Sequence, residues 1–120
     1  MFKKIILTTL LFGIILSQDK QKVVLITGTA LGIGKSTAEY LIDKGHIVYG
    51  GDILIQENLY LNDIGGTALE MDVTNQNHID NAVKKIISEQ GRIDVLVNNA
   101  GLGVYGAIED VSMEDIYYQY

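Results

Sequence analysis

Three glycines within eight residues constrain the fold of this chain more than any other feature. Residues 27–34 read TGTALGIG, which places Gly28, Gly32 and Gly34 in a G-x-x-x-G-x-G pattern. The apolar, β-branched run KVVLIT before them predicts a buried strand, and the apolar spacing after them predicts a helix. Gly28 fits a tight turn out of the strand, Gly34 allows close helix packing, and Gly32 lets a pyrophosphate approach the backbone because it has no Cβ.

This strand–loop–helix unit predicts a nucleotide-phosphate site, because a helix N terminus offers free N–H groups and a positive dipole end. The alternative is a glycine-rich turn that binds nothing. A Walker-type loop is excluded, since its first glycine would fall at Thr29, one position after Gly28.

The rest of the chain continues to alternate strands and helices. Thr74 is the expected N-cap of the central helix and Ser112 that of the last one. Apolar strands that alternate with helices indicate a doubly wound parallel sheet of the α/β class, in the order 3-2-1-4. The fourth strand is then an exposed edge, although its sequence is typical of an interior strand, so later strands are expected to be missing. The expected strands are 22–27, 46–51, 67–71 and 93–97, and the expected helices are 32–44, 75–90 and one after 112, with 53–61 ambiguous but best matched by a short helix.

Composition excludes several function classes. The chain has 120 residues, a net charge of −6 and no cysteine, so it forms one domain at most, without disulfides or thiolate metal sites. No Lys/Arg cluster indicates a nucleic-acid surface. His46 and His78 are expected to be solvated surface residues rather than metal ligands or bases, and no metal site is expected.

The N-terminal segment, residues 1–18, has the layout of a signal peptide or short hydrophobic anchor. Lys3 and Lys4 precede an uncharged run, Ile5–Leu16, and Ser17 follows it. As a helix this run reaches about 18 Å, short of the roughly 30 Å hydrocarbon core. We expect an exported or membrane-associated protein, with membrane contact through residues 5–16. A cytoplasmic location, an extra packed helix or an over-extended start are the alternatives.

From Lys22 to Tyr120 the chain resembles the short-chain dehydrogenase/reductase family, because three motifs of that family occur here in the same order. Thr27–Gly34 matches its T-G-x-x-x-G-x-G signature, Asp72-Val73 matches the acidic residue after its third strand, and Asn98–Gly101 matches its N-N-A-G signature. The resemblance implies that residues 21–120 form a truncated NAD(P)-binding Rossmann domain. It also implies hydride transfer between a nicotinamide cofactor and a small alcohol or carbonyl substrate, and a homo-oligomer when complete.

Asp52 predicts NAD rather than NADP as the cofactor. It ends the second strand, 18 residues after Gly34, where a carboxylate accepts hydrogen bonds from ribose hydroxyls and repels a 2′-phosphate. The next residue, Ile53, stands where NADP-preferring relatives often carry arginine. The alternative is a solvated acid at a strand end.

By the same resemblance, Asp72 should accept a hydrogen bond from the adenine amino group, unless it only caps the following turn. The Val73 backbone should lie beside the adenine ring. Asn98 and Asn99 are expected to act through backbone and strand-locking hydrogen bonds. The expected cofactor-binding residues are Gly28, Thr29, Leu31, Gly32, Ile33, Gly34, Asp52, Asp72, Val73, Asn98, Ala100 and Gly101.

No catalytic residue can be assigned. The family's serine and Tyr-x-x-x-Lys pair are expected beyond Tyr120, which makes this chain a fragment of an enzyme. Residues 40–44 spell Tyr-x-x-x-Lys, but they follow the glycine loop on the wrong side of the sheet, so Tyr40 is expected to pack and Lys44 to be solvated. The alternatives are a non-catalytic dinucleotide-binding protein and an inactive relic.

Overall fold

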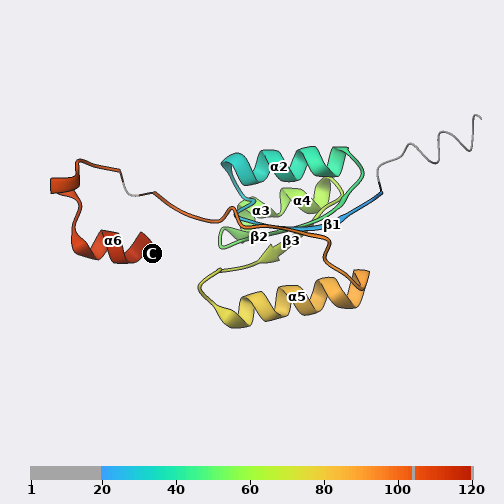
Figure 1. Cartoon of the computed structure of the whole chain (residues 1–120). Helices are drawn as coiled ribbons and strands as arrows, with labels where there is room; N and C mark the ends of the chain where they lie inside the picture. Colours follow the sequence, from blue (N-terminus) through green and yellow to red (C-terminus); the bar gives the residue numbers. More distant parts are fainter. Residues whose placement is uncertain (1–19, 104, 120) are drawn as a thin grey trace, which may run out of the picture.

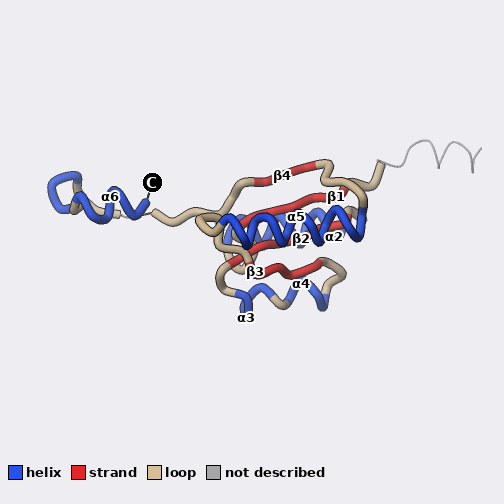
Figure 2. The backbone as a smooth tube through the Cα atoms, turned by 90° about the horizontal axis from the view of Figure 1, so that it is seen from below, coloured by secondary structure: helices blue, strands red, loops and turns tan. Residues whose placement is uncertain are grey.

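A four-stranded parallel sheet forms the centre of the computed structural model, which describes residues 20–103 and 105–119. The strands lie in the order β3-β2-β1-β4, and every neighbouring pair is parallel (Figure 2). This confirms the predicted α/β class and the 3-2-1-4 order. The strands are β1 (Val23–Thr27), β2 (Ile47–Asp52), β3 (Thr67–Glu70) and β4 (Val95–Val97).

Helices cover both faces of the sheet (Figure 1). On one face lie α2 (Gly32–Asp43), α3 (Ile55–Asn58) and α4 (Tyr60–Asp63), and on the other lies α5 (Gln76–Gln90). Successive residues of a strand point to opposite faces. Val23 and Leu25 of β1 therefore belong to the core beneath α5, and Val24 and Ile26 to the core beneath α2.

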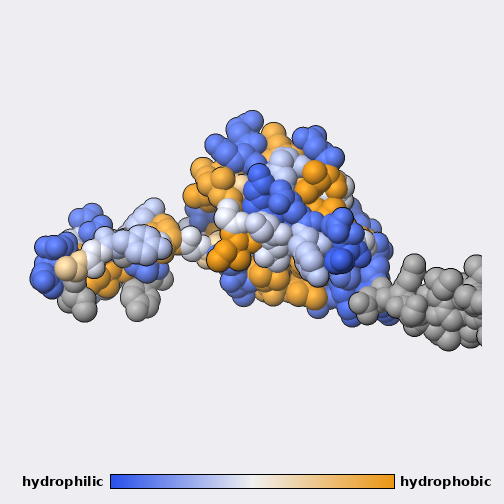
Figure 3. Space-filling view, turned by 90° about the horizontal axis from the view of Figure 1, so that it is seen from above, coloured by the Kyte–Doolittle hydropathy of each residue, from blue (hydrophilic) through white to orange (hydrophobic). Residues whose placement is uncertain are grey.

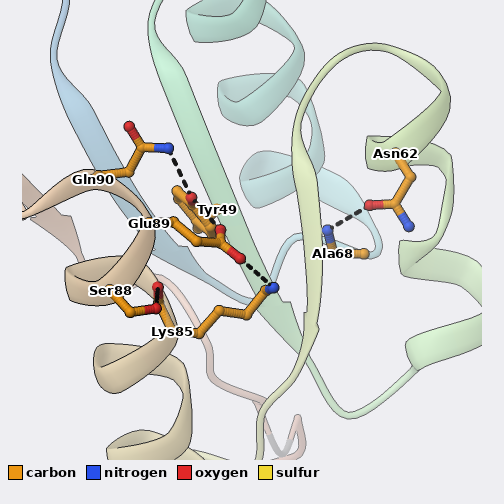
Figure 4. Close-up of polar contacts among 7 residues, drawn as sticks. All are labelled: Tyr49, Asn62, Ala68, Lys85, Ser88, Glu89 and Gln90. Atoms are coloured by element: carbon orange, nitrogen blue, oxygen red, sulfur yellow. Dashed lines mark hydrogen bonds and ion pairs between the residues drawn. The ribbon is translucent and has the colours of Figure 1, made fainter.

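A polar network attaches the C-terminal part of α5 to the sheet (Figure 4). The hydroxyl of the buried Tyr49 in β2 donates to Glu89 Oε2 at 2.6 Å and accepts from Gln90 Nε2 at 3.1 Å. Lys85 pairs with the other carboxylate oxygen of Glu89 at 2.5 Å. Burial, and then the hydrogen bond to Glu89, raises the pKa of Tyr49 above its usual value. The phenol therefore stays a donor and fixes α5 against β2.

The residue that caps α5 differs from the prediction. The side chain of Asn75 accepts from the backbone N–H groups of Asn77 and His78, so Asn75 is the N-cap. The expectation for Thr74 was wrong because its hydroxyl donates instead to Asp72 Oδ1 at 2.6 Å.

The cap of α6 (Met113–Gln119) agrees with the prediction. Ser112 Oγ accepts from Asp115 N at 3.1 Å. A short 3₁₀ turn (Ile108–Asp110) precedes this helix, which lies away from the sheet (Figure 1).

The segment predicted as one ambiguous short helix forms two, α3 and α4. Asn62 in α4 accepts a hydrogen bond from the backbone N–H of Ala68 in β3 at 2.9 Å (Figure 4). This contact holds α4 beside the outer strand of the sheet.

The two histidines are structural rather than simply solvated, which corrects the prediction. His46 Nδ1 accepts from the backbone N–H of Lys22 at 3.2 Å, and His78 Nδ1 accepts from that of Asp72 at 3.1 Å. Both rings are half-buried. Within residues 20–103 and 105–119, no group of three His, Cys, Asp or Glu side chains could hold a metal ion.

Strand β4 forms one edge of the sheet, and its central residue Leu96 is 56% exposed. The prediction of an exposed fourth strand is confirmed. None of the described helices is both long and apolar enough to cross a membrane. The predicted targeting segment, residues 1–18, lies outside the described residues.

Candidate functional site

The predicted site residues meet at one edge of the sheet. Four loops leave the carboxyl ends of the four strands, and in a parallel sheet these ends share an edge. The strand register places Thr27 beside Gly51, Ile26 beside Val97, and Asp52 beside Glu70. The glycine loop and the segments that begin at Asp52, Asp72 and Asn98 therefore lie along one side of the molecule.

The glycine loop is held tightly at its base and is open at its tip. Gly28 has φ +77°, and its N–H donates to Gly51 O at 2.7 Å. A Cβ on Gly34 would lie 1.9 Å from Gly28 O, so only glycine lets the first turn of α2 rest on this loop. Gly32 has φ +59°, and a Cβ there would meet no atom of residues 20–103 or 105–119 within 4 Å. The space in front of Gly32 is thus free for a ligand.

Within the described part of the chain, no side chain caps the N terminus of α2. Leu31 occupies the N-cap position, where Ser, Asp or Asn is usual, and the first turn contains no acidic residue. Leu31 and Ile33 are 61% and 80% exposed. Apolar patches interrupt the polar surface of the face seen in Figure 3. The first N–H groups of α2 thus remain available to an anion.

A buried polar cluster holds the glycine loop on its interior side. This cluster was not predicted from the sequence. Thr29 and Asn58 are both fully buried, and Thr29 Oγ1 donates to Asn58 Oδ1 at 2.8 Å. Asn58 Nδ2 donates to Gly50 O at 2.8 Å, and Tyr60 OH donates to Thr29 O at 2.9 Å. The side chain of Thr29, a predicted cofactor contact, faces the interior, so only its backbone could meet a ligand.

One sequence signal could have indicated this cluster. Gly50 and Gly51 form a glycine pair inside a strand, where glycine often marks close approach of another group. A Cβ on Gly50 would lie 2.4 Å from Thr29 Oγ1 and 2.3 Å from Leu61 Cδ1. Gly50 therefore makes room for the buried cluster, whereas a Cβ on Gly51 would meet the side chain of Met71.

Tyr60 connects this cluster to the charges around the loop. The Lys35 ammonium lies 4.5 Å from the centre of the Tyr60 ring. Burial, and then the negative charges of Glu39 and Asp52, raises the pKa of Tyr60 to about 12. Tyr60 therefore remains a neutral donor to Thr29 O at physiological pH.

This pKa shift predicts that Tyr60 contributes to an alkaline loss of stability, and a Tyr60→Phe variant should lack that contribution. Between pH 10 and about 12 the unfolded chain releases the Tyr60 proton while the folded chain retains it, so stability is complete below pH 10 and falls as the pH rises. Below pH 10 the variant should be less stable by about 1 kcal/mol, because it lacks the bond to Thr29 O. Urea unfolding across this pH range should show the gap between parent and variant closing. A gap that stays constant to pH 12 would contradict this assignment.

Asp52 joins the end of β2 to the glycine loop. Its Oδ2 accepts from the backbone N–H of Ala30 at 2.9 Å, and its Oδ1 accepts from that of Leu54 at 2.9 Å. The carboxylate is thus held in one orientation, half-exposed at the sheet edge. Each carboxylate oxygen can accept a further hydrogen bond, so a ligand hydroxyl could still bind here.

Asp72 is held from three sides and keeps one oxygen free. Its Oδ1 accepts from Thr74 Oγ1 at 2.6 Å and Thr74 N at 2.9 Å, and these bonds lower the pKa of Asp72. Its carbonyl accepts from Asn75 N at 3.0 Å and its N–H donates to His78 Nδ1. Among the described residues, Oδ2 accepts no hydrogen bond. Asp72 therefore caps the turn through Oδ1 and can bind a donor through Oδ2, beside the half-exposed Val73.

Asn99 locks the loop after β4 to the end of β1. Its Nδ2 donates to Thr27 O at 3.1 Å and to Gly28 O at 3.0 Å. Thr27 Oγ1 accepts from the N–H groups of Asn99 at 3.1 Å and Ala100 at 2.9 Å. Asn98, Ala100 and Gly101 are exposed at the same edge. The locking role expected of the asparagine pair thus belongs to Asn99.

The Tyr-x-x-x-Lys sequence at residues 40–44 lies on α2 and outside this edge. Tyr40 was expected to pack, but it is 61% exposed. The Lys44 ammonium lies 5.3 Å from the centre of its ring. The pair is therefore a surface contact along one helix.

Residues 22–120 match a protein family described as short chain dehydrogenase. The chain is 48% identical over 99 residues to a 3-ketodihydrosphingosine reductase from Bacteroides thetaiotaomicron, a match that covers 82% of this chain and 35% of that protein. It is 40% identical over 102 residues to a cyclopentanol dehydrogenase from Comamonas testosteroni, covering 78% of this chain and 40% of the relative. The chain thus spans about two fifths or less of these two relatives.

Solved structures show the same fold. A 3-ketoacyl-(acyl-carrier-protein) reductase from Brucella melitensis, complexed with NADH, superposes with a TM-score of 0.75 at 31% identity, covering 82% of this chain and 42% of that one. An aldohexose dehydrogenase from Thermoplasma acidophilum in ligand-free form gives 0.68 at 37% identity, covering 83% and 37%.

Proposed function

This chain belongs to the short-chain dehydrogenase family, and from that premise we propose that it forms the NAD-binding part of an oxidoreductase. The proposed reaction is hydride transfer between NAD and a small alcohol or carbonyl compound. The names of the relatives support this substrate class, since they include a ketone reductase and an alcohol dehydrogenase. One solved neighbour was crystallised with NADH.

One observation carries the cofactor proposal: Asp52 lies directly beside the glycine loop and is bonded to it. The Ala30 N–H donates to the Asp52 carboxylate at 2.9 Å. An anion-binding helix end and a fixed carboxylate are thus next to each other, as a ligand with both a pyrophosphate and a ribose diol requires.

Each part of the site fits one part of the dinucleotide. The open space at Gly32 and the uncapped N terminus of α2 would bind the pyrophosphate. The Asp52 carboxylate would accept from the adenosine ribose hydroxyls, and Asp72 Oδ2 with the Val73 backbone would bind adenine. Leu31, Ile33, Asn98, Ala100 and Gly101 would line the remainder of the cofactor. The bound cofactor would supply the hydride acceptor, and this chain's residues would orient it.

The preference for NAD over NADP rests on charge. A 2′-phosphate would bring about two negative charges toward the fixed Asp52 carboxylate, which disfavours NADP by repulsion. Lys35, in the first turn of α2, lies with its ammonium 4.5 Å from the centre of the Tyr60 ring. We therefore propose NAD as the cofactor.

An Asp52→Ala variant tests this proposal. Loss of charge-assisted bonds to the ribose should weaken NAD binding by about 10- to 100-fold, and the preference over NADP should disappear. Asp43→Ala, at the far end of α2, removes the same charge from an exposed position and serves as the control. Calorimetric titration with both dinucleotides measures the effect. A variant that still binds NAD as tightly as the parent, and still rejects NADP, would overturn the assignment.

The remaining proposals concern the whole protein. The catalytic serine, tyrosine and lysine would lie in a part of the same protein outside residues 1–120. The whole protein would form a homo-oligomer. We further propose export or membrane association through residues 1–18. No nucleic-acid partner is proposed, because the chain is acidic.

A further inference from the structure

We propose that His78 is a positioning residue for the adenine end of the dinucleotide site. The inference rests on the proposed function, because it concerns how Asp72 meets the adenine amino group. In this proposal His78 makes no direct contact with the dinucleotide. It acts through the backbone of Asp72, six residues earlier in the chain.

The contact joins the first turn of α5 to the end of β3. His78 Nδ1 accepts from Asp72 N at 3.1 Å, and the ring is half-buried. The preceding residue, Met71, donates its N–H to Asp52 O at 3.0 Å. Asp72 is thus the first residue after the last backbone hydrogen bond between this strand end and β2. The His78 ring therefore holds the chain at the point where it leaves the sheet.

The four hydrogen bonds to Asp72 together fix where its free oxygen points. Thr74 binds Oδ1 twice and Asn75 binds the carbonyl, so these bonds set the turn that follows Asp72. Among the described residues, only His78 Nδ1 accepts from the Asp72 N–H, on the side from which β3 enters. Without it the peptide between Met71 and Asp72 can rotate, and Oδ2 loses its fixed direction.

The chemistry of the contact requires an acceptor at one position. Nδ1 accepts here, so the ring carries its proton on Nε2. Asparagine places its Oδ1 at the same number of bonds from Cβ as Nδ1 and is also an acceptor. A His78→Asn variant should keep the bond, and a His78→Ala variant should lose it.

The molecule contains its own control for this contact. His46 Nδ1 accepts from the backbone N–H of Lys22 at 3.2 Å, which is the same kind of bond. It lies where β1 and β2 begin, at the opposite end of the sheet from the dinucleotide site. A His46→Ala variant removes one equivalent bond without touching the site.

The test compares NAD with its hypoxanthine analogue, which lacks the adenine amino group. The full chain and its His78→Ala, His78→Asn and His46→Ala variants are titrated with both dinucleotides. The parent should prefer NAD by roughly tenfold, the value of one hydrogen bond to a charged group. His78→Ala should bind both dinucleotides almost equally, and the other two variants should keep the preference.

Each other outcome separates the two proposals. A parent that binds neither dinucleotide overturns both the proposed function and this inference. A parent that binds both equally overturns the contact of Asp72 with the adenine amino group, and with it the role of His78, but leaves the rest of the dinucleotide site standing. A His78→Ala variant that keeps the preference overturns only the role of His78. Loss of the preference in His46→Ala as well would show a general effect of stability and would also overturn it.

Discussion

A Gly34→Ala variant is expected to lose dinucleotide binding and much of its stability. The added Cβ would lie 1.9 Å from Gly28 O and 2.5 Å from Asn99 Nδ2. The obstructing atoms are a backbone carbonyl and a side chain that bonds it, so the loop itself must move. Overpacking of this kind costs about 3 kcal/mol or more. Because the displaced loop is the proposed pyrophosphate site, NAD affinity should fall by at least about 100-fold.

Gly91→Ala is the matched control for Gly34→Ala. Gly91 ends α5 with φ +74°, and a Cβ there would meet none of the described atoms within 4 Å. The left-handed backbone alone should cost about 1–2 kcal/mol, and NAD affinity should not change. Urea unfolding and calorimetry measure both quantities. If Gly34→Ala were no less stable than Gly91→Ala and bound NAD like the parent, the assigned close contact would be wrong.

An Asn99→Ala variant should separate the β4 loop from the glycine loop. The amide donates to two carbonyls, Thr27 O and Gly28 O, and alanine would leave both without this partner. Two lost bonds at a half-buried position predict a destabilisation of about 2–3 kcal/mol. NAD affinity should fall by about tenfold or more, because the base of the glycine loop is no longer held.

Asn62→Ala is the control for this second variant. Asn62 also makes a side-chain bond to backbone, from Ala68 N, but at the outer edge of the sheet. Its loss should cost about 1 kcal/mol and leave NAD affinity unchanged. Equal losses of affinity in the two variants would contradict a specific role for Asn99.

The sheet could be predicted because its strands are encoded locally. The run before Gly28 is β-branched and apolar, and all five residues of β1 are buried. The order of the strands then followed from the rules of parallel crossovers. The glycine pattern predicted the loop because glycine is needed where the backbone leaves no space for a Cβ. In the structure a Cβ on Gly28 or on Gly34 would collide with neighbouring backbone atoms.

The buried cluster was missed because its partners are distant in the sequence. Asn58 bonds Thr29 across 29 residues and lies in a segment whose pattern was ambiguous. A polar residue in such a segment resembles a solvated one until the fold buries it. Thr74 failed as the cap for a different, local reason: its hydroxyl donates to Asp72, two residues earlier, and Asn75 caps the helix instead.

The most direct test of this account is a calorimetric titration of the full chain with NAD. We expect one NAD to bind per folded chain and NADP to bind more weakly, because the open end of α2 and the Asp52 carboxylate are both in place. Circular dichroism on the same sample would establish that the chain is folded. A folded chain that takes up no NAD would contradict the central claim that this sheet edge is a dinucleotide site.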